Sequence, residues 1–180
     1  MIASYFNLLS EAATRIDKPK ATQAIKVVQD ALLGGKLVCT IGNGGSSSTA
    51  SHFVNDWLKG LSLDRNSRCR AICLSDNTPT LTAIGNDIGF EEVFAFQVSR
   101  LMSEGDVLVC VSGSGNSPNI LSAVAAAHQL NVTVVAITGF DGGLLLKASD
   151  FAFHVPINDM QIVEDLHSTF GHLVLRSSVQ

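Results

Sequence analysis

The chain has 180 residues, 46% of them hydrophobic and 16% charged, which suits one globular domain with a sizeable core and excludes a disordered chain. Its formal net charge of −4 supplies no basic field, so we expect no direct contact with nucleic acid. No apolar run reaches the roughly 18 residues of a membrane helix, and the N-terminus lacks a signal-peptide pattern, so we expect a cytoplasmic protein without membrane contact.

Two helices are predicted before the first strand. Residues 1–15 carry apolar side chains at helical spacing, and residues 21–33 do the same until Gly34 and Gly35 end the pattern. Each helix has an apolar face to bury, and packing on the chain's own sheet would satisfy that need.

Five short apolar segments separated by helical stretches predict a parallel sheet with right-handed crossovers. We expect an α/β fold of three layers, a doubly wound five-stranded parallel sheet with N-terminal helices, forming a single domain over 1–180. The N-terminal helices would occupy 1–34, and the sheet and a C-terminal helix 35–180. The predicted strands are 37–41, 70–74, 107–111, 132–137 and 151–155. Four cysteines lie in or beside these strands without CxxC spacing, which favours buried reduced thiols over disulfides or a cysteine metal site.

The first strand runs into a glycine turn, GNGGS at 42–46, and then into a helix. Asn43, Gly44 and Gly45 allow a tight turn, because glycine tolerates positive φ and has no side chain to block a ligand. Ser46 is a suitable N-cap, so free N–H groups and the positive end of the helix dipole would face one space. This predicts a phosphate-sized site. A plain structural turn is the alternative, because the pattern matches neither the dinucleotide fingerprint nor the P-loop. Lys59 and Gly60 would end this helix as a C-terminal cation and a C′ glycine.

Residues 107–117, VLVCVSGSGNS, repeat the plan of a strand followed by glycine and serine. Ser112, Ser114 and Ser117 offer three hydroxyls at the carboxyl end of a strand, where ligands of open α/β sheets bind. A second turn of this kind in one small domain favours a phosphate site over a structural coincidence.

At these turns the chain resembles the sugar isomerase (SIS) domain family of phosphosugar-binding proteins, and within it the sedoheptulose 7-phosphate (phosphoheptose) isomerases. The matching blocks, in order, are GNGGS at 42–46, the helix with His52, GND at 85–87, SGSGNS at 112–117, TGFDGG at 138–143 and the last helix with His172. The resemblance implies a flavodoxin-like fold, a phosphorylated sugar as substrate, and a homotetramer with active sites between subunits.

The resemblance also implies a set of substrate-binding residues. Asn86 and Asp87 are turn formers by local chemistry, but the equivalent pair belongs to the substrate site of the resembled isomerases. Gly113 stands where serine or threonine is common, and we expect the loop to bind phosphate through its backbone N–H. The full set is Asn43, Gly44, Gly45, Ser46, Asn86, Asp87, Ser112, Gly113, Ser114, Ser117 and Glu164.

Two helices carry the candidate metal ligands. His52 and Asp56 are four residues apart and face one way. Glu164 and His172 are two turns apart, about 12 Å along the helix axis, so spacing permits a joint metal site without requiring one. The resemblance implies one zinc per subunit, held by His52, Asp56, Glu164 and His172. Two of these positions depart from the family, which has Glu at position 56 and Gln at position 164. Glu164 also has another interpretation, as an exposed residue paired with His167.

Two functions follow from these residues. The first is an aldose–ketose phosphate isomerase that interconverts sedoheptulose 7-phosphate and a heptose 7-phosphate for surface (lipo)polysaccharide biosynthesis. Asp56 would be the base, a metal at His52, Glu164 and His172 would stabilise the oxyanion of an enediolate, and His172 would act as acid when not a ligand. The second is a non-catalytic phosphosugar-binding SIS protein that serves as a regulatory or replication-initiator-binding module. The two histidines favour the enzyme, and the departures at positions 56 and 164 keep the second function open.

Overall fold

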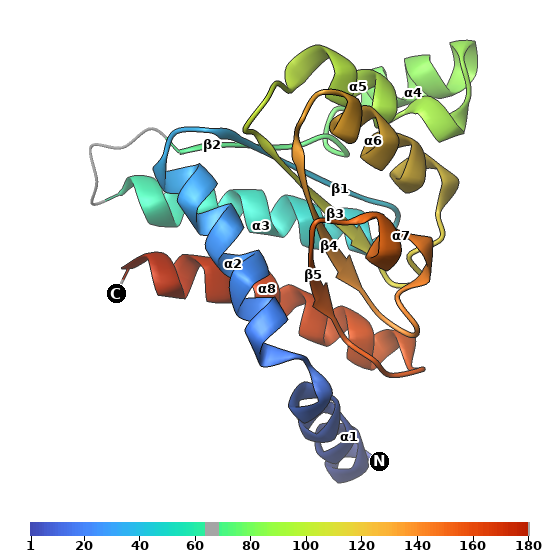
Figure 1. Ribbon diagram of the computed structural model, residues 1–180. Helices are drawn as coiled ribbons and strands as arrows, with labels where there is room; N and C mark the ends of the chain where they lie inside the picture. The colour runs from blue at the N-terminus through green and yellow to red at the C-terminus, as the bar shows by residue number, and fades with distance from the viewer. Residues whose placement is uncertain (64–68, 180) are drawn as a thin grey trace.

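The structure, a computed structural model, describes residues 1–63 and 69–179 (Figure 1). Its centre is one five-stranded sheet in the order β2-β1-β3-β4-β5, in which every pair of neighbours is parallel. The strands are β1 (Leu37–Gly42), β2 (Arg70–Cys73), β3 (Val107–Ser112), β4 (Thr133–Thr138) and β5 (Phe151–His154). All five predicted strands are confirmed, with ends that differ by one residue. Because strand order reverses between β1 and β3, a crevice is expected outside the carboxyl ends of these two strands.

Helices cover both faces of the sheet, which confirms the predicted three layers. One face carries α2 (Lys18–Leu33), α3 (Gly45–Ser62) and α8 (Met160–Val179), and α1 (Ile2–Arg15) contacts α8. The other carries α4 (Thr78–Asp87), η1 (Phe90–Glu92), α5 (Ala95–Leu101), α6 (Pro118–Gln129) and α7 (Gly143–Ala148). Alternate residues of each central strand pack against the helix layers on the two faces of the sheet. Val109 of β3 packs with the first group, and Leu108 and Cys110 pack with the second.

The two N-terminal helices differ in how they bury their apolar faces. Helix α2 begins where the Asp17 carboxylate accepts a hydrogen bond from the Lys20 N–H, and it packs along β5 and α8. Helix α1 extends away from the sheet (Figure 1). Its Ile2 and Phe6 side chains are exposed. The apolar face of α2 is therefore buried by the chain itself, whereas much of the face of α1 is not.

Both ends predicted for the helix that follows the GNGGS turn are wrong. Helix α3 begins at Gly45, and its N-cap is Gly44 with φ 52°, so Ser46 lies inside the first turn. At the other end α3 continues past Gly60 to Ser62. A Cβ on Gly60 would lie 2.6 Å from Cδ1 of Leu175, so this glycine allows α8 to approach closely instead of ending the helix.

The cysteines are free, and Cys39, Cys73 and Cys110 are buried in the strands, as the sequence predicts. Burial raises the pKa of the Cys39 thiol to about 12, which keeps it protonated and unreactive. Within residues 1–63 and 69–179, no helix is long and apolar enough to cross a membrane.

Candidate active site

The two glycine and serine turns meet at the carboxyl ends of β1 and β3, where strand order reverses. They enclose a cavity of about 180 Å³. Its lining residues are Asn43, Ser46, Val111, Ser112, Gly113, Ser114, Ser117, Met160 and Glu164. Seven of these nine were predicted from the sequence as substrate-binding residues, and the tertiary structure brings them together.

A pair of amides ties the two turns to each other. Asn43 Nδ2 donates to Asn119 Oδ1, and Asn119 Nδ2 donates to Asn43 Oδ1, each over 2.9 Å. Asn119 is almost fully buried, in the first turn of α6. The Asn43 side chain is therefore committed to holding the turns in place, and sequence reasoning missed its partner. The available signal was that Asn119 lies four residues before Ala123 and eight before Ala127, on the buried face of α6.

The serine turn leaves hydroxyl groups available to a ligand. Ser112 Oγ accepts from the Gly115 N–H over 3.2 Å, and Ser114 Oγ accepts from the Asn116 N–H over 3.3 Å. Within residues 1–63 and 69–179 neither hydroxyl donates a hydrogen bond, so both can donate to a ligand. Ser117 is the N-cap of α6 but makes no side-chain cap. With Ser46, the cavity presents four hydroxyls at the N-terminal ends of α3 and α6, where the helix dipoles favour an anion.

Met160 occupies the space of the missing hydroxyl at position 113. A Cβ on Gly113 would lie 2.9 Å from Met160 Sδ, so a serine or threonine at position 113 would displace this side chain. The departure at position 113 is thus matched by a thioether that narrows the cavity.

Glu164 also lines this cavity, on the first turns of α8. Its Oε1 lies 3.3 Å from the place of a Cβ on Gly45, at the start of α3. Across the part of the chain that the structure describes, its carboxylate takes part in no hydrogen bond or ion pair. The predicted pairing with His167 is wrong, because His167 is only 1% exposed and both of its ring nitrogens lack a partner among the described residues. This burial lowers the pKa of His167 to about 4.

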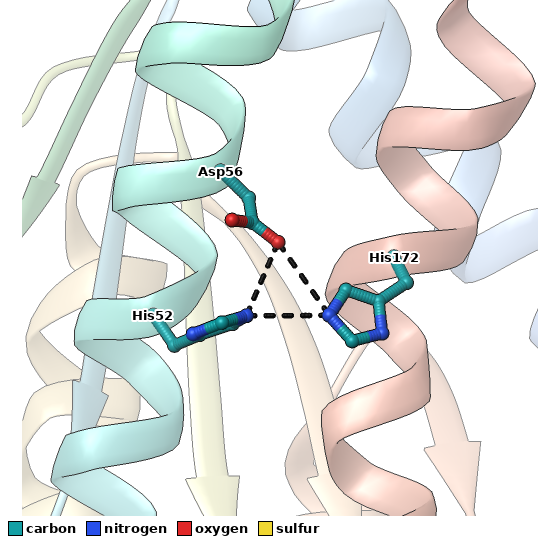
Figure 2. A group of neighbouring side chains, drawn as sticks. All are labelled: His52, Asp56 and His172. Atoms are coloured by element: carbon teal, nitrogen blue, oxygen red, sulfur yellow. Dashed lines mark hydrogen bonds and ion pairs between the residues drawn. The ribbon is translucent and has the colours of Figure 1, made fainter.

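His52, Asp56 and His172 form a compact group two turns further along the same helices (Figure 2). Asp56 Oδ2 lies 3.2 Å from His52 Nε2 and 3.5 Å from His172 Nε2, and the two Nε2 atoms are 3.2 Å apart. Ligands at zinc distances of 2.0–2.1 Å in a tetrahedron are about 3.3 Å from one another. The spacing of the three atoms therefore fits one face of a zinc coordination tetrahedron.

Close packing of α3 and α8 assembles this group. Gly171 precedes His172, and a Cβ on it would lie 2.2 Å from Cδ1 of the buried Phe53. Trp57 Nε1 donates to the Gly171 carbonyl oxygen over 3.1 Å, and its ring stacks on Phe53 at 5.4 Å. A residue without a side chain at 171 thus lets the two helices approach until His172 reaches Asp56.

The chain is similar to known proteins over most of its length. Residues 3–139 match the SIS domain family. The chain belongs to the SIS-domain family. This SIS protein is 39% identical to the phosphoheptose isomerase of Rhodospirillum rubrum over 156 residues, which cover 87% of this chain and 82% of the relative. It is also 39% identical to the phosphoheptose isomerase of Shewanella denitrificans over 167 residues, 88% of this chain and 85% of the relative.

Solved structures of relatives share the fold over almost the whole chain. The phosphoheptose isomerase of Francisella tularensis superposes with a TM-score of 0.89 at 35% identity, covering 97% of this SIS protein and 94% of the other chain. The enzyme of Neisseria gonorrhoeae gives the same TM-score at 34% identity, covering 99% and 96%. The flavodoxin-like SIS fold that the sequence predicted is confirmed.

The remaining predicted site residues of this SIS protein lie outside the cavity. Asn86 and Asp87 are exposed at the end of α4, where the Asn86 amide donates to Asp87 Oδ1 over 2.8 Å. Gly44 and Gly45 form the backbone of the first turn. The candidate metal-binding group contains His52, Asp56 and His172, and Glu164 lines the cavity instead.

Proposed function

We propose that this SIS protein is an aldose–ketose phosphate isomerase that interconverts sedoheptulose 7-phosphate and a heptose 7-phosphate. It would work in the cytoplasm as a homotetramer, supplying heptose for surface polysaccharide. The relatives named phosphoheptose isomerase support this function. The observation that carries it is the placement of a His52, Asp56 and His172 group two helical turns from an anion cavity, between the same two helices.

The distance between the cavity and the group of His52, Asp56 and His172 suits the length of the substrate. Glu164 at the cavity and His172 are eight residues apart on α8, about 12 Å along the axis. An extended seven-carbon sugar phosphate has a comparable length. With its phosphate on the serine turn, its carbonyl end would reach Asp56 and His172.

Isomerisation moves a proton between adjacent carbons through an enediolate, so it needs a base at carbon and a donor at oxygen. Asp56 is the base. Its Oδ2 faces both imidazoles, and its Oδ1 accepts only the Asn55 amide over 3.2 Å within the described residues. His172 is the acid only in the state in which its Nε2 carries a proton and does not hold a metal.

The phosphate is held by the hydroxyls of Ser46, Ser112, Ser114 and Ser117 and by the N-terminal ends of α3 and α6. This binding fixes the distant end of the sugar, so that little motion remains at the reacting carbons. Asn86 and Asp87 would complete the substrate site from another subunit, because they lie outside the cavity of their own chain.

A zinc ion would be held by His52, Asp56 and His172, whose three facing atoms match its ligand spacing. When bound, it would polarise the sugar's carbonyl oxygen and stabilise negative charge there. Glu164 would serve on the substrate side, at the cavity. None of these observations favours the non-catalytic binding module over the enzyme.

The test is turnover of sedoheptulose 7-phosphate by the purified protein, with added zinc and with a chelator. We expect zinc-dependent turnover that falls at least about 100-fold in Asp56→Asn, in line with the loss of a general base. Asp30→Asn removes the same charge from the exposed face of α2 and should leave turnover unchanged. Absence of turnover in the zinc-loaded wild type would refute the function.

A further inference from the structure

The TGFDGG turn at 138–143 and the start of α7 support the serine turn of the anion cavity. The Gly139 N–H donates to the Gly113 carbonyl oxygen over 2.9 Å, and the Leu145 N–H donates to the Gly115 carbonyl oxygen over 2.9 Å. The backbone of the serine turn is thus fixed at two places by residues that follow β4. Where its hydroxyls lie in the cavity therefore depends on the conformation of the TGFDGG turn.

Phe140, inside the TGFDGG turn, has an unfavourable backbone conformation. Its φ is 50°, in the left-handed region, where the Cβ of a bulky residue crowds the following carbonyl oxygen. Its ring lies beside the serine turn, with Cε2 3.8 Å from the place of a Cβ on Gly113. Such a conformation persists only where the surrounding structure holds it.

Two hydrogen bonds hold the backbone of Phe140. Its N–H donates to the Ile157 carbonyl oxygen over 3.2 Å, and its own carbonyl oxygen lies 3.0 Å from His154 Nε2. A carbonyl oxygen only accepts, so His154 Nε2 carries the proton and donates it. His154 is half-buried at the end of β5, where it pairs in register with Thr138 of β4. Its imidazole therefore connects the sheet to the strained residue.

Relaxation of Phe140 would disturb the rest of the turn. It would rotate the two peptide groups that flank Phe140, and one of them carries the Gly139 carbonyl oxygen, which accepts from the Gly142 N–H over 2.8 Å. The Gly142 carbonyl oxygen is so close to Gly115 that no Cβ would fit there. A change at Phe140 is therefore passed directly to the serine turn.

We propose that His154 is a positioning residue for the anion cavity. By donating to the Phe140 carbonyl oxygen, it keeps the TGFDGG turn in the strained conformation that supports the serine turn. His154 is not among the residues that line the cavity, so it acts through Phe140 and not on the ligand itself. This inference rests on the proposed function, because it takes the serine turn as the phosphate site.

The test compares His154→Phe, which keeps an aromatic ring but removes the donor, with His154→Gln, which keeps an N–H donor. In His154→Phe we expect the dissociation constant for inorganic phosphate, measured by calorimetry on the purified protein, to rise at least about fivefold, the effect of one lost hydrogen bond. In His154→Gln it should stay within about twofold of the wild type, because the amide can donate. For sedoheptulose 7-phosphate, KM should rise in His154→Phe while kcat changes less than about twofold, because the base and the acid lie at the other end of the sugar.

A second variant, Phe140→Gly, isolates the effect of backbone strain. Glycine adopts a positive φ about as readily as a negative one, so the turn in Phe140→Gly needs no donor to hold it. Adding His154→Phe to Phe140→Gly should therefore raise the phosphate dissociation constant less than about twofold. The matched control is His128→Phe, the same substitution at an exposed histidine of α6 that faces Asp150, and it should leave phosphate binding unchanged.

The inference is overturned if His154→Phe binds phosphate as tightly as the wild type, even if urea denaturation shows lower stability, because the hydrogen bond would then be structural only. It is also overturned if His154→Phe weakens binding equally with and without Phe140→Gly, or if the wild type does not bind phosphate. Failure of the proposed function alone would appear differently, as a wild type that binds phosphate but does not turn over the sugar phosphate.

Discussion

Replacing Gly171 with alanine tests whether helix contact builds the metal group. The new Cβ would lie 2.2 Å from Phe53 Cδ1 and 2.8 Å from its Cε1, where ordinary contact begins at 3.4 Å. Phe53 cannot swing aside, because it is fully buried between Trp57 and Phe170, at ring distances of 5.4 and 5.9 Å. The structure must therefore move α8 away from α3 by a large part of an ångström.

The expected magnitude has two parts. Alanine in place of glycine inside a helix stabilises by about 1 kcal/mol through propensity. Overpacking of a filled core destabilises by about 1–3 kcal/mol and occasionally more. For a clash this short we take the upper end and expect a net loss of about 2 kcal/mol. Because Gly171 is next to His172, we also expect the zinc dissociation constant to rise at least about tenfold.

The assays are chemical denaturation at fixed protein concentration and a zinc titration against a competing chelator. Gly85→Ala is the matched control, since it also lies in a helix but its Cβ would meet only Val93 Cγ1, at an ordinary 3.7 Å. This variant should be as stable as the wild type or more so. If Gly171→Ala matched Gly85→Ala in stability and in zinc affinity, close approach of the two helices would not be what assembles the group.

Two further predictions concern buried polar side chains. The folded-state pKa of His167 is about 4, below its ordinary 6.5, so the unfolded chain takes up a proton first and stability falls as pH drops from 6.5 toward 4. Between pH 7 and pH 5 the free energy of unfolding should fall by about 2 kcal/mol because of His167. Urea denaturation of His167→Leu should show a fall that is smaller than that of the wild type by this amount. An equal fall in both proteins would contradict the low pKa of His167. In Asn119→Ala the Asn43 amide loses both of its hydrogen bonds to Asn119. We therefore expect the free energy of unfolding to fall by about 1–3 kcal/mol and phosphate binding, measured by calorimetry, to weaken. If stability and phosphate binding were both unchanged, the amide pair would not be what holds the two turns.

The sequence alone determined the sheet and the edge of the sheet at which the candidate site lies. Short apolar runs identified all five strands to within a residue. For β1 and β3, in which every residue is buried, a continuously apolar run is what burial on both faces requires. The same local chemistry identified GNGGS and SGSGNS as turns that leave N–H and hydroxyl groups free. The i and i+4 spacing of His52 and Asp56 placed them on one face of a helix, and the structure has them 3.2 Å apart.

The tertiary structure decided what spacing along one chain segment could not. Gly60 has the local signature of a helix end, yet it continues the helix because Leu175 packs against it. Glu164 and His172 share a helix, but α8 runs beside α3 so that Glu164 lines the cavity and His172 lies beside Asp56. These outcomes depend on which side chains a second helix presents, and that information is distributed over segments more than 100 residues apart.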